Sequence, residues 1–203
     1  NNGGTVYLNN RNYYDNGDWN NLGRLTAGSG QKIRIQNVRV VGGTQQNPNL
    51  MSYFYLQDPG WTALSFSGTQ VTRYDEEVGQ TLTRYVSDSG VDLVNIDFEN
   101  IYCNGRLFGF NSGSLTDCDF NNIESVQHTF FFTGAYFGEM PLPITDCNFI
   151  NCRQTYPGNA PEGGSDGTGQ LGVVFGAKLT RCNFINTSSA THGGAFCLSD
   201  ESE

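Results

Sequence analysis

A short pattern of apolar and polar positions recurs along the second half of the chain. Its four good copies read LVNIDFENI, LTDCDFNNI, ITDCNFINC and LTRCNFINT, and they begin at Leu93, Leu115, Ile144 and Leu179. In each copy an aromatic residue follows the first aliphatic residue by five positions, and an asparagine follows the aromatic residue by two. A fainter copy upstream carries Ile35, Val38, Val40 and Gly42 in the same columns. Such self-similarity indicates a repeat protein.

Numbering each copy from its aromatic residue defines columns with different roles. The aromatic column at position 0 consists of Phe98, Phe120, Phe149 and Phe184. The asparagine column at position +2 consists of Asn100, Asn122, Asn151 and Asn186. Position −2 is cysteine in three copies, at Cys118, Cys147 and Cys182. Alternation with a period of two residues is typical of strands, so positions −2 and 0 are predicted to point inward, and the polar positions −1 and −3 outward. Asparagine at +2 is predicted to turn the strand, because asparagine tolerates left-handed backbone and its amide can bond the amides of adjacent copies.

The spacing of the copies selects the kind of repeat. The aromatic positions are 22 residues apart from Phe98 to Phe120, and then 29 and 35 residues apart. The longer intervals contain inserts rich in glycine and proline, at 136–143 and 153–170. No copy shows a helical period or a leucine-rich pattern, whereas each has a short alternating run, a corner and a second apolar run. Short strands that turn corners and stack ~4.8 Å apart form a parallel β-helix.

We therefore expect an all-β fold, a right-handed parallel β-helix (a solenoid) with loop insertions. Residues 1–203 are expected to form a single domain, with residues 44–90 as a β-rich insertion on its flank, because strand-like runs in that segment interrupt the repeat. The chain begins at Asn1 without methionine and stops at 200–203 directly after a strand-like run. Since an open last layer would expose strand edges, we expect the chain to be part of a longer solenoid.

Composition and charge narrow the range of partners. The chain has 203 residues, 26 of them glycine, and a formal net charge of −9 at pH 7. A negative charge of this size argues against nucleic acid and against anionic membrane surfaces as partners. The sequence contains no apolar run long enough to span a bilayer and no recognisable signal peptide.

The six cysteines admit two interpretations. The three in the −2 column can form a stack of buried thiols that act as small apolar side chains. Alternatively, adjacent layers bring Cα atoms within disulfide range, and Cys103, Cys152 and Cys197 are other possible partners. A metal site is not expected, because the sequence has no Cys-x-x-Cys motif and both histidines, His128 and His192, lie apart from the cysteine column.

The outward columns hold the residues with the strongest catalytic potential. Asp97 and Asp119, both at position −1, are expected to be neighbours on adjacent layers, with Asp117 and Asp146 beside them. Two carboxylates one layer apart repel, so one pKa should rise unless a cation bridges them. Acid–base cleavage of glycosides uses such a pair, and a calcium-assisted lyase would use a similar cluster.

Other features argue against catalysis at this face. Asn148 and Asn183 continue the same column and are typical of ordinary polar surface. Arg181 is the only basic residue expected nearby, although a lyase requires an arginine or lysine base. The sequence has no Ser-His-Asp order and no phosphate-cradling loop. We therefore expect a non-catalytic protein, with a polysaccharide-cleaving enzyme as the alternative.

Aromatic residues in the interrupting segment are candidates for ligand binding. They could stack on sugar rings or, alternatively, pack the segment onto the body of the protein, and they are Tyr53, Tyr55, Trp61, Tyr74 and Tyr85. The SDGTG run at 165–169 has oxygen ligands at short spacing but lacks the full carboxylate set of a calcium loop. No cofactor is expected, and calcium is the one metal for which the sequence offers any signal.

Two segments resemble a known class of repeat proteins. CNFINTSSATHGGAF (182–196) and GGTVYLNNRNYY (3–14) are similar to the repeats of polymorphic outer-membrane-protein passengers and adhesin-like right-handed parallel β-helix proteins. The resemblance implies a secreted or cell-surface, extracellular protein that is adhesive or structural and has no catalytic residues to carry over. Its implied partners are a host or neighbouring cell surface, glycans and other copies of itself.

These observations leave three functions to distinguish. The first is a non-catalytic, carbohydrate- or cell-binding adhesin-like β-helix that uses residues 44–90 and 153–170 as its contact surface. The second is a lyase or glycoside hydrolase that uses Asp97, Asp117, Asp119 and Asp146. The third is a structural fibre segment that assembles end to end.

Overall fold

The described part of the protein is built from β-strands. The structure, a computed structural model, describes residues 4–8, 11–13, 23–47, 50–56, 62–76, 79–86, 88–126, 129–133, 142–155, 172–175, 177–190, 195 and 197–198. No helix occurs among these residues. Their strands form a parallel sheet of twelve strands, a second parallel sheet of six strands and a two-stranded antiparallel hairpin. The predicted all-β class and parallel pairing are therefore confirmed.

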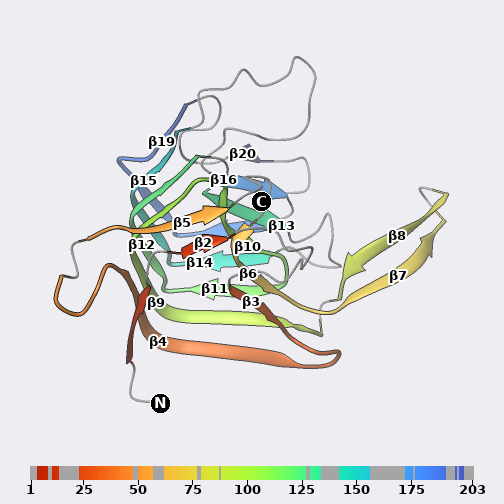
Figure 1. The fold of residues 1–203 in the computed structure, drawn as a ribbon. Helices are drawn as coiled ribbons and strands as arrows, with labels where there is room; N and C mark the ends of the chain where they lie inside the picture. Colours follow the sequence, from red (N-terminus) through yellow and green to blue (C-terminus); the bar gives the residue numbers. More distant parts are fainter. Residues whose placement is uncertain are drawn as a thin grey trace.

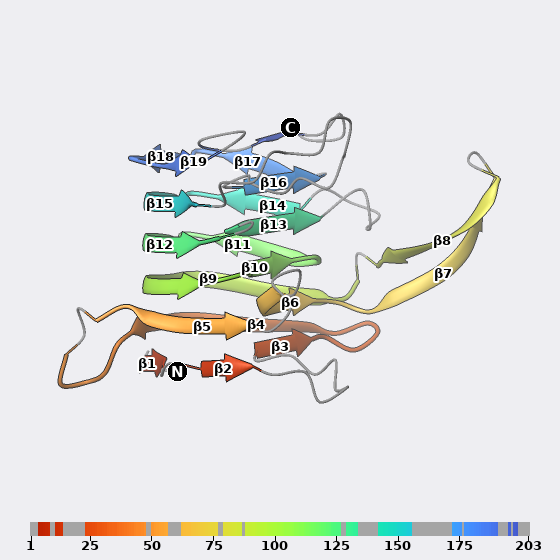
Figure 2. The ribbon, with the colours of Figure 1, turned by 45° about the horizontal axis from the view of Figure 1, so that its top comes forward.

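The chain passes through successive layers, and each layer lies against the next through parallel pairing (Figure 2). A complete layer contributes to the larger sheet three stretches that are separated by two corners. The stretches before the first corner lie in β4 (Lys32–Gly42), β9 (Gly90–Cys103), β11 (Gly113–Thr116), β14 (Leu142–Thr145) and β17 (Ala177–Thr180). The stretches between the corners lie in β1 (Gly4–Leu8), β4, β9, β12 (Asp119–Ser125), β15 (Asn148–Gln154) and β18 (Asn183–Ile185).

The remaining strands complete each layer. The stretches after the second corner lie in β2 (Arg11–Tyr13), β5 (Ser52–Leu56), the ends of β9, β12 and β15, and β19 (Ser188–Ser189). The smaller sheet consists of β3 (Gly23–Thr26), β6 (Thr62–Ser67), β10 (Arg106–Phe110), β13 (Phe130–Thr133), β16 (Gly172–Phe175) and β20 (Cys197–Leu198). Because side chains of both sheets share one buried cluster, the sheets curl around a common core.

The register confirms the columns inferred from the repeat. Phe98 pairs with Phe120, Phe120 with Phe149, and Phe149 with Phe184. In the fainter copy, Val40 pairs with Phe98. Gly42 then takes the place of the asparagine, and a Cβ there would lie 1.7 Å from the carbonyl oxygen of Asn100. Glycine is required at this position because no side chain fits so close to the backbone of the next layer.

Each of the four good copies bends at two left-handed residues, one at position −3 and one at position +2. The +2 residues Asn100, Asn122, Asn151 and Asn186 have φ angles of 57°, 57°, 52° and 52°. This confirms that the asparagine column turns the strand. The −3 residues also have positive φ angles, of 52–56°, and they are Asn37, Asn95, Asp117, Asp146 and Arg181. We predicted the −3 column only as outward polar surface, so this first corner was missed.

The two corners shift the alternation of inward and outward side chains. In β9 the inward residues Leu93, Ile96, Phe98, Ile101 and Cys103 are at most 3% exposed. Their spacing is three residues across each corner and two residues elsewhere. A left-handed residue therefore acts like a one-residue bulge, because it adds a position without changing which face the following strand buries.

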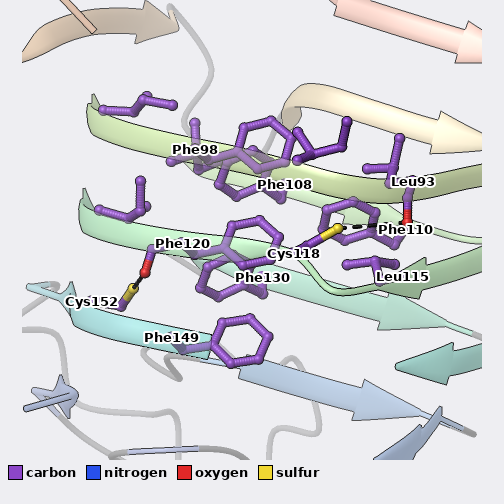
Figure 3. Packing of buried hydrophobic residues seen from close by; sticks show 14 of the residues in the cluster. Leu93, Phe98, Phe108, Phe110, Leu115, Cys118, Phe120, Phe130, Phe149 and Cys152 are labelled. Carbon is purple, nitrogen blue, oxygen red and sulfur yellow. Dashed lines mark hydrogen bonds between the residues drawn. The ribbon is translucent and has the colours of Figure 1, made fainter. Parts of the chain in front are cut away.

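Stacked phenylalanine rings fill the core. The ring centroids of Phe98 and Phe120 are 5.0 Å apart, those of Phe120 and Phe149 5.0 Å, and those of Phe149 and Phe184 4.7 Å, with interplanar angles of 6°, 2° and 8°. Phe108 and Phe130 of the smaller sheet meet this column edge-on, as Figure 3 shows. Each such ring pair contributes about 0.5–1.5 kcal/mol beyond the burial of its area. The core therefore ties successive layers and both sheets together.

The segment 44–90 divides into two parts. Its strands β5 and β6 belong to the layer that β4 begins, because they pair with β9 and β10 of the next layer. Among the described strands of this segment, β7 (Gln70–Asp75) and β8 (Gln80–Tyr85) leave the layers, as an antiparallel hairpin that projects from the body (Figure 1). The β-rich excursion is thus the hairpin, whereas β5 and β6 complete a layer.

Candidate functional site

The register brings the candidate carboxylates of the −1 column together. Asp97 pairs with Asp119, Arg39 precedes them in the same column, and Asn148 follows. The Nδ2 of Asn148 donates a hydrogen bond to Oδ1 of Asp119 over 2.6 Å. This column therefore changes from basic to acidic to amide side chains across four layers, rather than presenting only carboxylates.

Asp97 is a carboxylate of perturbed pKa in this column. Burial raises the pKa of Asp97, the charges of Asp119 and Glu99 raise it further, and Arg39 opposes them. The direction agrees with the expectation for neighbouring carboxylates, but the largest cause is loss of solvent rather than repulsion. Arg39 is itself held by Glu99, with Nε–Oε1 and Nη2–Oε2 distances of 2.9 Å and 2.7 Å.

The other two candidate carboxylates lie at the first corner, not in the −1 column. Asp117 and Asp146 are both left-handed residues of the −3 column. Asp146 accepts two hydrogen bonds of 2.6 Å from Arg181, and this pairing lowers the pKa of Asp146. The arginine that could have acted as a base on this face is therefore engaged by a carboxylate of its own column.

A shallow depression of about 400 Å³ lies beside Asp97. Its polar lining comes from Thr5 of β1, Asn37 and Arg39 of β4, and Asn95 and Asp97 of β9. The Nδ2 of Asn95 donates a hydrogen bond of 2.9 Å to Oδ1 of Asn37, so one wall of the depression is a short amide ladder. The depression thus places an aspartate of raised pKa near an arginine on an open surface.

The described residues offer no grouping for a metal ion. No set of three or more histidine, cysteine, aspartate or glutamate side chains among them is placed to hold one. The candidate calcium run 165–169, His128 and His192 lie outside the described residues.

The candidate tyrosines fall into different environments. Tyr53 and Tyr55 point outward from β5 and are 52% and 49% exposed, whereas Tyr74 lies on the hairpin and is 64% exposed. Tyr85 is 9% exposed, its hydroxyl accepts a hydrogen bond of 3.0 Å from Nδ2 of Asn111, and burial raises its pKa. Tyr85 therefore packs the base of the hairpin instead of facing a ligand. Trp61 lies outside the described residues.

Three further surface residues belong with Tyr53, and the sequence interpretation missed them. Tyr102 of β9 pairs with Tyr53 in register, and their ring centroids are 5.0 Å apart. The same outward column continues to Glu124 and Arg153, which form an ion pair with an Nε–Oε2 distance of 2.7 Å. All three residues stand at position +4 of their copies, and the available signal was the three-residue step between inward positions across the asparagine corner, which turns position +4 outward.

The cysteine column forms a stack of free thiols in the structure. Cys118 and Cys147 are fully buried, Cys182 is half-buried, and each donates to a backbone carbonyl, as Figure 3 shows for Cys118. Cys103 and Cys152 are also buried free thiols, and burial raises the pKa of each to about 12. The surroundings of Cys103 and Cys152 are apolar, so these two thiols fill space in the core and are poor nucleophiles.

Comparison of the chain with protein-family models, with curated proteins and with solved structures finds no match in any of the three. Within the part of the chain that the structure describes, no helix has the length and apolarity that crossing a bilayer requires. The class that fold and surface define is thus an all-β protein with a curled, layered parallel sheet.

Proposed function

We propose that this protein is a secreted or cell-surface, non-catalytic, adhesin-like right-handed parallel β-helix that binds glycans or cell surfaces. The layered parallel pairing and the core shared by the two sheets support a β-helix. A right-handed coil is the expected hand, since parallel strands in one sheet are joined by right-handed crossovers in nearly all proteins. The similarity of residues 3–14 and 182–196 to adhesin-like repeats supports the same class.

The observation that carries the proposal is the exposure of aromatic side chains on a rigid strand. Tyr53 and Tyr55 alternate with the buried residues Phe54 and Leu56 on β5, so both tyrosine rings stand on the solvent side of a strand fixed by the core. Tyrosine combines an apolar ring face with a polar tip, which suits it to partners that are partly polar, such as sugars. A strand anchored in this way presents the rings at little cost in conformational entropy.

The test is binding of the full chain to a glycan array and to intact cells. We expect saturable binding without release of reducing sugar, together with a monomeric protein at the concentration of the assay. Binding to neither glycans nor cells would contradict the proposal. Growth of long end-to-end assemblies in sedimentation, with no binding to either, would instead favour a structural fibre segment.

A polysaccharide-cleaving enzyme is a second candidate, and the depression beside Asp97 favours it. The raised pKa of Asp97 suits a general acid, Asp119 is its neighbour in register on one side, and Arg39 is its neighbour on the other. Incubation with plant, bacterial and animal polysaccharides, followed by detection of reducing ends and of unsaturated uronates, tests this function. Product formation that Asp97→Asn abolishes and Asp75→Asn preserves would establish the enzyme. Absence of product with every substrate would exclude it for those substrates.

A further inference from the structure

One outward column on the larger sheet combines two aromatic side chains with an ion pair. The column consists of Tyr53 on β5, Tyr102 on β9, Glu124 on β12 and Arg153 on β15, and we call it the +4 stripe. These four strands lie one above another in consecutive layers (Figure 2). Adjacent members are therefore separated by one strand spacing of about 4.8 Å.

The aromatic end of the +4 stripe offers two inclined ring surfaces. The rings of Tyr53 and Tyr102 have centroids 5.0 Å apart and an interplanar angle of 53°, so they form a shallow V. Tyr53 is 52% exposed, and Tyr55, two residues further along β5, points to the same side and is 49% exposed. Tyr102 is half-buried, and its hydroxyl, like that of any tyrosine, is neutral at physiological pH and can donate a hydrogen bond.

The polar end of the stripe offers donors and acceptors without net charge. Arg153 contacts Oε2 of Glu124 through both Nε and Nη2, and the arginine side chain is 60% exposed against 17% for the glutamate. The guanidinium has more N–H groups than this contact uses, and the carboxylate has a second oxygen. The pair can therefore bond to sugar hydroxyls, which both donate and accept, while the local charge stays near zero.

We propose that the +4 stripe binds a neutral glycan chain that runs across the strands, with sugar rings on Tyr53 and Tyr102 and hydroxyls on Glu124 and Arg153. This inference rests on the proposed function and names its site and ligand class. The layer spacing is close to the length of one sugar unit in an extended glycan, so successive layers meet successive units. The net charge of −9 disfavours acidic glycans, which leaves neutral ones as the class that fits.

Cross-strand aromatic and charged pairs also stabilise sheets, so the test must separate binding from folding. The probes are neutral oligosaccharides of six units (cello-, manno- and galacto-oligosaccharides), with oligogalacturonate as an acidic comparison, titrated by calorimetry into the full chain. The variants are Tyr53→Ala, Tyr102→Leu and Glu124→Gln. Tyr74→Ala is the matched control, because Tyr74 is 64% exposed but lies on the hairpin. The Tm of every variant is measured in parallel.

We expect one of the neutral oligosaccharides to bind, and each tyrosine variant of the stripe to weaken binding at least about tenfold, a change of about 1.4 kcal/mol. Tyr74→Ala should change affinity less than about twofold, and 0.5 M NaCl should leave binding unchanged because no net charge is involved. If Tyr53→Ala and Tyr102→Leu both bind the glycan as tightly as the wild type, the +4 stripe is not the binding site, and the proposed function still stands. Binding of the acidic glycan alone would overturn the ligand class, and a chain that binds no glycan and no cells would overturn the proposed function as well.

Discussion

The stacked layers and the β7–β8 hairpin are both made of strands, but they are stabilised in different ways. In the layers, Phe120 is fully buried and contacts rings from the layers before and after it. In the hairpin, Leu82 is half-buried and Tyr74 is 64% exposed, and the strands pair only with each other. An isolated two-stranded hairpin is marginally stable, whereas each layer gains from two neighbours. A substitution in the layers should therefore lower the free energy of unfolding of the whole protein, whereas the effect of a substitution in the hairpin should remain local.

The largest expected effect comes from removing a ring from the phenylalanine column. Phe120→Ala should lower the free energy of unfolding by about 3–5 kcal/mol, because the ring's transfer energy is lost and a cavity remains between the sheets. Leu82→Ala in the hairpin should cost less than about 1 kcal/mol, since Leu82 is only half-buried there. Urea unfolding followed by circular dichroism measures both. Equal costs for the two changes would contradict the distinction between layers and hairpin.

An intermediate effect is expected at the second corner. Asn122 has a φ angle of 57°, and its Nδ2 donates a hydrogen bond of 2.7 Å to Oδ1 of Asn100. Asn122→Ala should cost about 1–2 kcal/mol, because alanine adopts left-handed backbone only with strain. Asn122→Gly removes the side chain without that strain and should be the milder change.

The hairpin supplies the control for this second experiment. Thr72→Ala removes one member of an exposed pair of hydroxyls, Thr72 and Thr83, and should leave the Tm of the protein nearly unchanged. If Asn122→Gly proves as costly as Asn122→Ala, the loss of the amide ladder dominates. Backbone strain would then not be the reason for asparagine at the corner.

The smallest expected effect concerns pH and Asp97. Because the folded protein raises the pKa of Asp97, the ionised carboxylate destabilises the fold above that pKa, and the penalty disappears as the pH falls below it. Asp97→Asn should thus raise the Tm slightly at pH 7, by about 1 °C or less, and not at all at acid pH. Asp75→Asn in the hairpin breaks an ion pair with Arg84 and should not raise the Tm. A lower Tm for Asp97→Asn at pH 7 would show that this carboxylate has a stabilising partner.

The sequence was sufficient to predict the columns that repeat without interruption. Phe120 and Asn122 were placed correctly because their type recurs at one spacing from a recognisable aromatic residue. The first corner was missed because its residues share no chemical type, and Arg181 there is not a residue that usually favours left-handed backbone. The three-residue step from Leu93 to Ile96 was the available signal, since a plain strand would keep a step of two.

The candidate site depends on contacts between residues that are far apart in the sequence, and the sequence pattern did not show which of them meet. Tyr53 was recognised as an aromatic candidate, but its neighbour Tyr102 belongs to a different layer, 49 residues away in the numbering. The segment between β4 and β5 hides the register that aligns them, because the repeat pattern is broken there. Tyr85 was chosen by residue type alone, and only the packing at the base of the hairpin shows that it is buried.

The shared register of layers that differ in length has a consequence for how such a chain can vary. Aromatic residues 22, 29 and 35 positions apart still fall in one stack, so extra residues between strands leave the interior undisturbed. Each connection between strands can therefore change in length and sequence independently of the others. A lineage carrying this frame can acquire new recognition surfaces on its periphery while the columns inside keep the same alignment.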